Sequence, residues 1–322
     1  MAHGITVKDR LAYVGEKPWH GLGVEVGDLM TASEALIQGG LTWRVIESPI
    51  FNEAGQKIEG YKSIKREDTG DVFQIVTDKY LPVQNVDCFK IFDSVCGTGQ
   101  AKYEVVGSLQ SGRKVWILAR LPYDFALANG KDEVRSYLLL TTSHDGSLAF
   151  QMFQTPIRVV CMNTLRASLQ TKQAGKVAYF KHTLNFKNRV GQSQAILAEA
   201  KAYFQQFKEI SEILVRKQLS ALEVKSLNEK TFGLEGKREN EISTKSKNAV
   251  NEVERLFVEG KGNQIEGVAG SAWAWWNGLT EYIDHERTTR GEDENRFASS
   301  QYGSGAELRE KGFSQVRELV LV

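Results

Sequence analysis

The stretch from Val134 to Val190 constrains the fold most, because strand-like patterns and an unusual charge distribution coincide in it. Two strand-like runs, VRSYLLLTTS and LAFQMFQTPIRVV, follow each other across a His-Asp-Gly turn and lead into a short helix. Residues 146–198 contain no Asp or Glu, although the chain has 40 acidic residues among 322; we call this segment the acid-free window. Its seven basic residues are Arg158, Arg166, Lys172, Lys176, Lys181, Lys187 and Arg189. The window therefore carries +7 in a chain whose net charge is +1.

Two interpretations of the acid-free window stay open. One is a buried sheet and helix with a few solvated lysines, and the other is a surface that meets a polyanionic backbone. Binders of single strands combine cations for the phosphates with rings on which the bases stack. The aromatic residues of the window are Phe150, Phe153, Tyr179, Phe180 and Phe186. The alternation in LAFQMF is equally typical of core positions for Phe150 or Phe153.

Composition narrows the class of protein. A length of 322 residues, with 41% hydrophobic and 25% charged residues, is typical of a soluble globular protein with one large domain or two ordinary ones. No run of about 18 apolar residues predicts a membrane span, and the N-terminus has no apolar signal region. We therefore expect a cytoplasmic protein without a membrane partner. The three cysteines lack CxxC spacing, which favours buried free thiols.

Before the window, local signals predict an alternation of helices and strands. Thr31 and Glu34 form a capping box that predicts a helix ending at about Gln38. Apolar spacing predicts a helix over 85–95, and the Ser111-Gly112 turn predicts a β-hairpin between residues 101 and 122. Further strands are expected within 41–51 and 72–83, with polar turn segments at 52–60 and 65–71 between them.

After the window the chain becomes helical. Residues 176–186 are either a strand or an extended arm, and a long helix is expected from Gly191. Residues 191–285 are predicted to be mostly helical. The predicted fold class is α+β: an antiparallel β-sheet with a hairpin packs on helices and is followed by a mostly helical C-terminal region. We expect two domains, 1–190 with the basic surface and 191–322 with a Trp-rich C-terminal block.

The C-terminal block combines tryptophans with basic and polar residues. Three of the six tryptophans open a predicted helix that carries Glu281 and His285 one turn apart. Such a pair could share a metal ion, but without an apparent third ligand a surface hydrogen bond or ion pair is favoured. Nearby arginines stand among Ser, Thr and Gly, a composition suited to holding phosphate, although acidic neighbours offset their charge. The residues concerned are Trp273, Trp275, Trp276, Arg287, Arg290 and Arg296.

Signatures of several enzyme classes are absent from the sequence. It contains no GxxxxGK[ST] phosphate loop and no GxGxxG, HExxH or GxSxG motif. Carboxylates such as Asp93, Glu104 and Asp145 could coordinate Mg²⁺ in a nuclease, but their spacing does not distinguish them from solvated acids. The sequence therefore favours binding over catalysis, with no cofactor and no catalytic metal.

Several motifs together resemble one protein family. They are PWHGLG (18–23), TPIRVVCMNTL (155–165), FKHTLNF (180–186), AWAWWNGLTEYIDHERTTRG (272–291) and ENRFASSQYGSGAEL (294–308). They resemble the phage and plasmid-like protein family built on domain of unknown function 932. The resemblance implies a phage or mobile-element source and no particular activity. The order of helix, hairpin, antiparallel strands and helix is also similar to the core of single-strand annealing proteins of the RecT, Red-beta and Rad-fifty-two type.

The leading hypothesis is a protein that binds single-stranded DNA and promotes strand annealing in recombination, as a homo-oligomeric ring or filament. Arg158, Arg166, Lys172, Lys181 and Arg189 would neutralise phosphates, with Lys176 and Lys187 beside them, and Arg113 and Lys114 at the hairpin tip would clamp the DNA or contact a second strand. One alternative is a protein-binding module, such as an antagonist of host defence, with the Trp-rich block as its contact surface. A metal-dependent nuclease is the other alternative.

Overall fold

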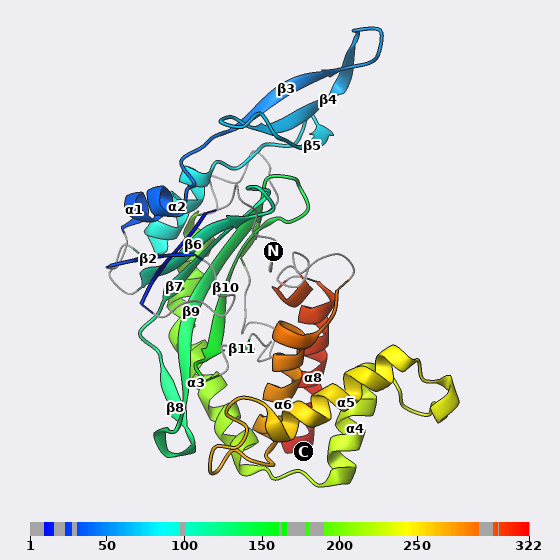
Figure 1. Ribbon diagram of the computed structural model, residues 1–322. Coiled ribbons are helices and arrows are strands. Elements are labelled where there is room, and N and C mark those ends of the chain that lie inside the picture. Colours follow the sequence, from blue (N-terminus) through cyan, green and yellow to red (C-terminus); the bar gives the residue numbers. More distant parts are fainter. Residues whose placement is uncertain are drawn as a thin grey trace. The chain divides into compact units, whose positions relative to one another are not determined.

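The structure is a computed structural model that describes residues 10–15, 23–27, 31–96, 101–160, 163–165, 178–180, 190–289, 299–301 and 303–321. It is a mixed α+β fold with antiparallel sheets and a mostly helical C-terminal region, which confirms the predicted fold class (Figure 1). The chain forms two compact units that are interleaved in sequence. The first comprises residues 1–122, 137–154 and 176–200, and the second comprises 123–136, 155–175 and 201–322. The domain boundary expected at residue 190 stays a prediction.

The larger sheet contains the strands predicted around the start of the acid-free window. Its strand order is β11-β10-β9-β7-β6-β1-β2, with β8 paired to β9 and β12 paired to β10. Strand β7 runs antiparallel to both of its neighbours, β6 and β9, whereas β1 and β2 are parallel. The bounds are β1 Leu11–Val14, β2 Val24–Val26, β6 Lys102–Leu109, β7 Lys114–Arg120, β8 Phe125–Leu127, β9 Asp132–Ser143, β10 Phe150–Arg158, β11 Asn163–Thr164 and β12 Ala178–Phe180.

The hairpin formed by β6 and β7 confirms the prediction made from the Ser111-Gly112 pair. Leu109 and Lys114 are the last paired residues, and the intervening turn has positive φ values. Gly112 has a φ of 93°, and a Cβ atom there would lie 2.8 Å from the ring of Trp43. Only glycine combines this backbone conformation with so close an approach. The turn therefore packs directly on Trp43.

A smaller sheet has the order β3-β4-β5, with bounds β3 Val45–Phe51, β4 Lys57–Arg66 and β5 Val72–Thr77. The polar segments 52–60 and 65–71 are predicted to be turns, and that prediction is wrong for β4, which overlaps both segments. Polar residues and Gly60 obscured this strand, but antiparallel pairing with β3 and β5 on both sides satisfies its backbone. At its end Arg66 lies 4.5 Å from the Trp43 ring centre and donates to the Ser111 carbonyl at 3.3 Å.

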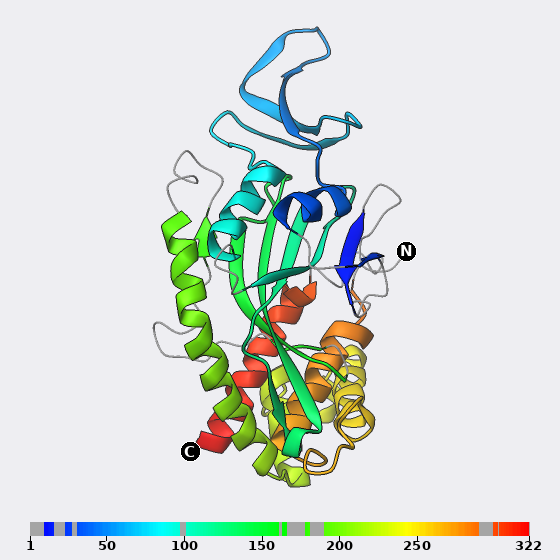
Figure 2. The same cartoon turned by 90° about the vertical axis from the view of Figure 1, so that its left-hand side faces the viewer.

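Two helices pack together in the first unit (Figure 2). Helix α1, Ala32–Gln38, begins with the predicted capping box, in which Thr31 and Glu34 exchange hydrogen bonds. Helix α2, Asn85–Cys96, confirms the predicted helix over 85–95. Its Phe89 and Phe92 contact Tyr103 of β6, with ring centres 5.8 and 5.4 Å apart. These contacts bury the apolar face of α2 against the sheet.

Helices dominate the second unit. Helix α3, Val190–Arg216, confirms the long helix expected from Gly191, and its residues after 200 belong to this unit. Phe207 of α3 packs with Trp273, Trp276 and Phe313 at ring-centre distances of 6.0–6.5 Å. Within the helix predicted to follow the second strand of the window, residues 163–164 form strand β11 instead, and positions 161–162 and 166–170 lie outside the described residues. The other helices are α4 Ala221–Phe232, α5 Thr244–Glu259, α6 Ala272–Glu281 with a π-helical extension Tyr282–Glu286, and α8 Ser304–Leu321.

Candidate nucleic-acid interface

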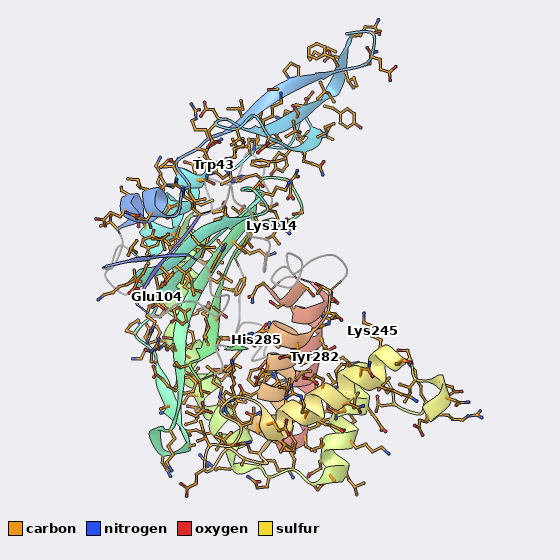
Figure 3. All side chains as sticks on the ribbon, viewed as in Figure 1. Trp43, Glu104, Lys114, Lys245, Tyr282 and His285 are labelled. Carbon is orange, nitrogen blue, oxygen red and sulfur yellow. The ribbon has the colours of Figure 1, made fainter. Side chains whose placement is uncertain are left out.

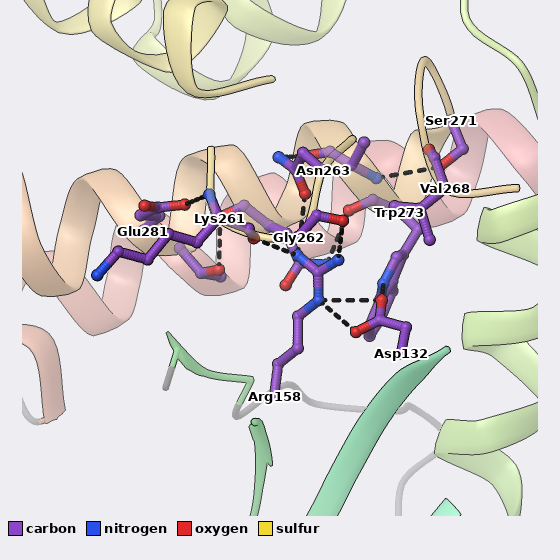
Figure 4. A network of polar contacts seen from close by, with 12 residues as sticks. Asp132, Arg158, Lys261, Gly262, Asn263, Val268, Ser271, Trp273 and Glu281 are labelled. Atoms are coloured by element: carbon purple, nitrogen blue, oxygen red, sulfur yellow. Dashed lines mark hydrogen bonds and ion pairs between the residues drawn. The ribbon is translucent and has the colours of Figure 1, made fainter. Parts of the chain in front are cut away.

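Only one of the seven basic residues of the acid-free window lies among the described residues. Arg158 ends β10, and both its side chain and that of Asp132 are 0% exposed. The Nε atom of Arg158 lies 2.8 and 3.0 Å from the two carboxylate oxygens of Asp132 (Figure 4). The other six residues predicted to contact phosphate, Arg166, Lys172, Lys176, Lys181, Lys187 and Arg189, lie outside the described residues.

The rest of the Arg158 guanidinium binds the loop between α5 and α6. Nη1 donates to the carbonyl of Lys261 at 3.2 Å and to Oδ1 of Asn263 at 2.9 Å, and Nη2 donates to the carbonyl of Gly262 at 2.9 Å. The prediction that Arg158 contacts phosphate is therefore wrong. A buried guanidinium needs a counter-charge and hydrogen-bond acceptors, and protein groups supply both.

The same buried network extends into α6. Trp273 Nε1 donates to Oδ2 of Asp132 at 2.9 Å, and Asn263 Nδ2 donates to the carbonyls of Leu256 and Ala274 at 2.8 and 2.9 Å. These bonds join the start of β9, the end of β10, the 260 loop and α6 within the second unit. The role of Asp132 as the partner of Arg158 was not predicted, because the two residues are 26 positions apart in the sequence.

Glu281 lies in the same region. The sequence predicts a hydrogen bond or ion pair between this residue and His285. Glu281 is only 6% exposed, and its Oε2 accepts the backbone N–H of Lys261 at 3.0 Å. The expectation of a surface hydrogen bond is wrong for this buried carboxyl. Burial raises the pKa of Glu281, and the Lys261 amide and the nearby His285 act in the opposite direction. Among the described residues, no three His, Cys, Asp or Glu side chains gather to hold a metal ion.

The hairpin residues Arg113 and Lys114 are both partly exposed (Figure 3 labels Lys114). The Arg113 guanidinium donates to the carbonyls of Phe73 and Val72 on β5 and lies over the Phe73 ring. Arg113 thus hydrogen-bonds the backbone of β5 at the edge of the small sheet. Lys114 begins β7, opposite Ser143 of β9. Contact of either residue with DNA stays a prediction.

Arg287 follows the π-helical turn and reaches the start of α8. Its Nη1 lies 3.4 Å from the hydroxyl of Ser299, and its Nη2 lies 3.2 Å from the hydroxyl of Ser304. A partly exposed guanidinium, two hydroxyls and the beginning of an 18-residue helix form a group suited to an anion. Arg290 and Arg296, predicted beside it, lie outside the described residues.

Five aromatic residues of the two candidate surfaces belong to the core. Phe150 and Phe153 are 0% and 2% exposed, which settles the open alternative in favour of core positions. Trp273, Trp275 and Trp276 are fully buried, so the prediction that they form a contact surface is wrong. Their indole groups lie in the core of the second unit, and Trp275 Nε1 donates to Oδ1 of Asn228 at 2.9 Å. Tyr179 and Phe180 lie in β12, and Phe186 is outside the described residues.

Comparisons with known proteins identify a family without adding an activity. No helix within the described ranges combines the length and apolar character needed to cross a membrane. Neither a curated protein nor a solved structure matches the chain. One family model, described as Domain of unknown function (DUF932), matches residues 72–301. This match covers more than two thirds of the sequence, and the chain therefore belongs to the DUF932 family.

Proposed function

We propose that this protein binds single-stranded DNA and promotes strand annealing during recombination of a phage or other mobile element, in the cytoplasm of a bacterial host. The observation that carries the proposal is the charge of the acid-free window. With Arg158 assigned to the core and neutralised by Asp132, six basic residues and no acidic residue remain. Unopposed cations at this density favour a polyanionic partner, because neutralising phosphates releases condensed counterions.

The order of secondary structure supports the annealing role. Helix α2, the β6–β7 hairpin and strands β9 and β10 follow one another in an order similar to helix, hairpin and further antiparallel strands in the core of single-strand annealing proteins. In those proteins a basic groove holds one strand with its bases exposed, and the subunits assemble into rings or filaments. Annealing of this kind needs backbone contacts without sequence readout, and neither a nucleotide nor a catalytic metal. This is a likeness of organisation, and fold alone does not fix function.

The Arg287 group supports phosphate binding independently of the window. Arg287 is a permanent cation, and the two serine hydroxyls that accept from it retain hydrogens that can donate to phosphate oxygens. The backbone N–H groups at the start of α8 point in the direction that favours an anion. An Arg287→Gln variant should therefore weaken phosphate contact while the window remains intact.

Fluorescence anisotropy of a labelled oligo-dT strand at two salt concentrations tests the proposal. We expect wild-type affinity to fall with salt, and the Lys181→Glu/Arg189→Glu variant to bind weakly, with a salt slope shallower by about 0.7 for each phosphate that is no longer neutralised. Lys245→Glu/Lys247→Glu is the matched control, because it changes net charge equally at two positions of α5 (Figure 3 labels Lys245). No binding at low salt, or equal weakening in both variants, contradicts the proposal.

A protein-binding module, such as an antagonist of host defence, is the second candidate. The observation in its favour is the small sheet, where Phe51, Tyr61, Val72 and Ile75 are 46–57% exposed. An apolar protein interface should depend little on salt, whereas phosphate binding should weaken steeply. Mg²⁺-dependent cleavage of the labelled strand would instead identify the metal-dependent nuclease.

A further inference from the structure

One face of the small sheet combines a half-exposed aromatic ring with a cation. Five cross-strand pairs define this surface, because directly opposed residues point to the same side: Tyr61 with Thr77, Ser63 with both Ile75 and Ser48, and Lys65 with both Ile46 and Val72. We call it the Tyr61 face. Tyr61 is 48% exposed and Ile75 is 54% exposed, and they lie diagonally across β4 and β5. The ring and the aliphatic side chain thus form one apolar patch beside a lysine.

Carboxylates are kept off the Tyr61 face. Glu47 lies opposite Ile64 on the other face, where it pairs with Lys62 at 2.8 Å. Glu59 is separated from Tyr61 by Gly60, whose φ of 82° interrupts the alternation of the strand, and it pairs with Lys57 at 2.9 Å. The eight residues that define the face therefore carry one positive charge and no negative charge. This charge complements a polyanion.

The edge of the small sheet is closed to an added strand at β5. Arg113 donates to the carbonyls of Val72 and Phe73, and the amide of Ile75 donates to Oε1 of Gln74 at 3.1 Å. The carbonyl of Thr77 accepts the amide of Tyr80 at 3.0 Å. On the other edge, Pro49 of β3 has no backbone N–H that could donate to an added strand. Recognition by strand addition is thus disfavoured along β5 and at Pro49 of β3, whereas the Tyr61 face is open to a partner that does not pair with the backbone.

We propose that the Tyr61 face binds the bases of single-stranded DNA, an inference that rests on the proposed function and adds a second surface to it. A base stacks on the Tyr61 ring, Ile75 contacts a neighbouring base, and Lys65 neutralises a phosphate. Stacking tolerates every base because each presents a π-face, which fits a protein that reads no sequence. The Tyr61 face supplies the aromatic contact that the buried Phe150 and Phe153 do not.

Binding of labelled oligo-dT by the full chain tests the inference with three variants. Tyr61→Ala should weaken binding roughly 5- to 160-fold, the range expected for removal of one base–aromatic stack. Tyr61→Phe keeps the ring and should bind as the wild type does. Leu222→Ala removes an apolar side chain that is 80% exposed on α4 and serves as the control. Ultraviolet cross-linking followed by mass spectrometry should place the thymine adduct on the peptide that contains Tyr61.

The outcomes separate this inference from the proposed function. If the wild type binds and Lys181→Glu/Arg189→Glu does not, but Tyr61→Ala binds as tightly as the wild type, the Tyr61 face is refuted while the proposed function stands. If neither the wild-type protein nor any variant binds at low salt, both are refuted. Unchanged DNA binding by Tyr61→Ala combined with a smaller molar mass in light scattering would also refute the inference, and would identify the face as an interface between copies of this chain.

Discussion

Removal of the Asp132 carboxylate should strongly destabilise the protein. Asp132 is the counter-charge of Arg158, both side chains are 0% exposed, and Asp132 also accepts from Trp273. Asp132→Ala leaves a buried guanidinium without compensation, which costs about 3–5 kcal/mol. Total stabilities of domains are about 5–15 kcal/mol, so this cost is a large fraction of the total. At about 2–4 °C per kcal/mol, we expect the Tm to fall by roughly 6–20 °C.

A double-mutant cycle with Arg158→Met isolates the pair. In Arg158→Met, Asp132 keeps its charge and the hydrogen bond from Trp273. The oxygen atoms of Lys261, Gly262 and Asn263 that accept from the guanidinium lose that donor. Each single variant therefore leaves one buried charge uncompensated, whereas Asp132→Ala/Arg158→Met leaves neither. The double variant should lose less stability than the sum of the singles, by about 0.5–3 kcal/mol.

Urea unfolding followed by tryptophan fluorescence measures these free energies, and oligo-dT binding by the folded variants separates stability from function. The folded fraction of Arg158→Met should bind as tightly as the wild type. The reasoning is refuted if Asp132→Ala stays within about 0.5 kcal/mol of the wild type, the range of ordinary surface substitutions. It is equally refuted if Arg158→Met keeps full stability and weakens DNA binding, because Arg158 would then contact phosphate.

Three smaller predictions concern single positions. Burial raises the pKa of Glu281 above its ordinary 4.5. The protonated carboxyl therefore stabilises the folded state at low pH, and this stability is lost as the pH rises through the folded-state pKa. In urea unfolding measured at a series of pH values, Glu281→Gln should make the midpoint less dependent on pH in this range. Gly112→Ala combines a φ of 93° with a Cβ atom 2.8 Å from the Trp43 ring and should cost at least about 1 kcal/mol by thermal melting. Ser220→Ala removes the N-cap of α4 and should cost about 1 kcal/mol in the same assay.

Elements specified by local chemistry were predicted well from the sequence. The capping box at Thr31, the apolar spacing of 85–95 and the turn at Gly112 each carry their signal within a few residues, and α1, α2 and the β6–β7 hairpin follow them. Strand β4 was missed because its residues are polar and its stability comes from two neighbouring strands. Burial of the three tryptophans could not be read from composition, since an aromatic cluster is typical of a core and of an interface alike.

Arg158 shows why a count of charge along the sequence overstates a binding surface. The acid-free window excludes every acid between residues 146 and 198, but Asp132 lies before it and Asn263 far beyond it. A usable signal was nevertheless present, because Arg158 stands within the apolar run TPIRVV of a predicted strand. Arginine is almost never fully buried without a partner, so an arginine in such a strand predicts a distant carboxylate. The basic residues of the window after residue 165 stand in polar segments without that apolar setting, and within the window they are the ones that stay candidates for phosphate.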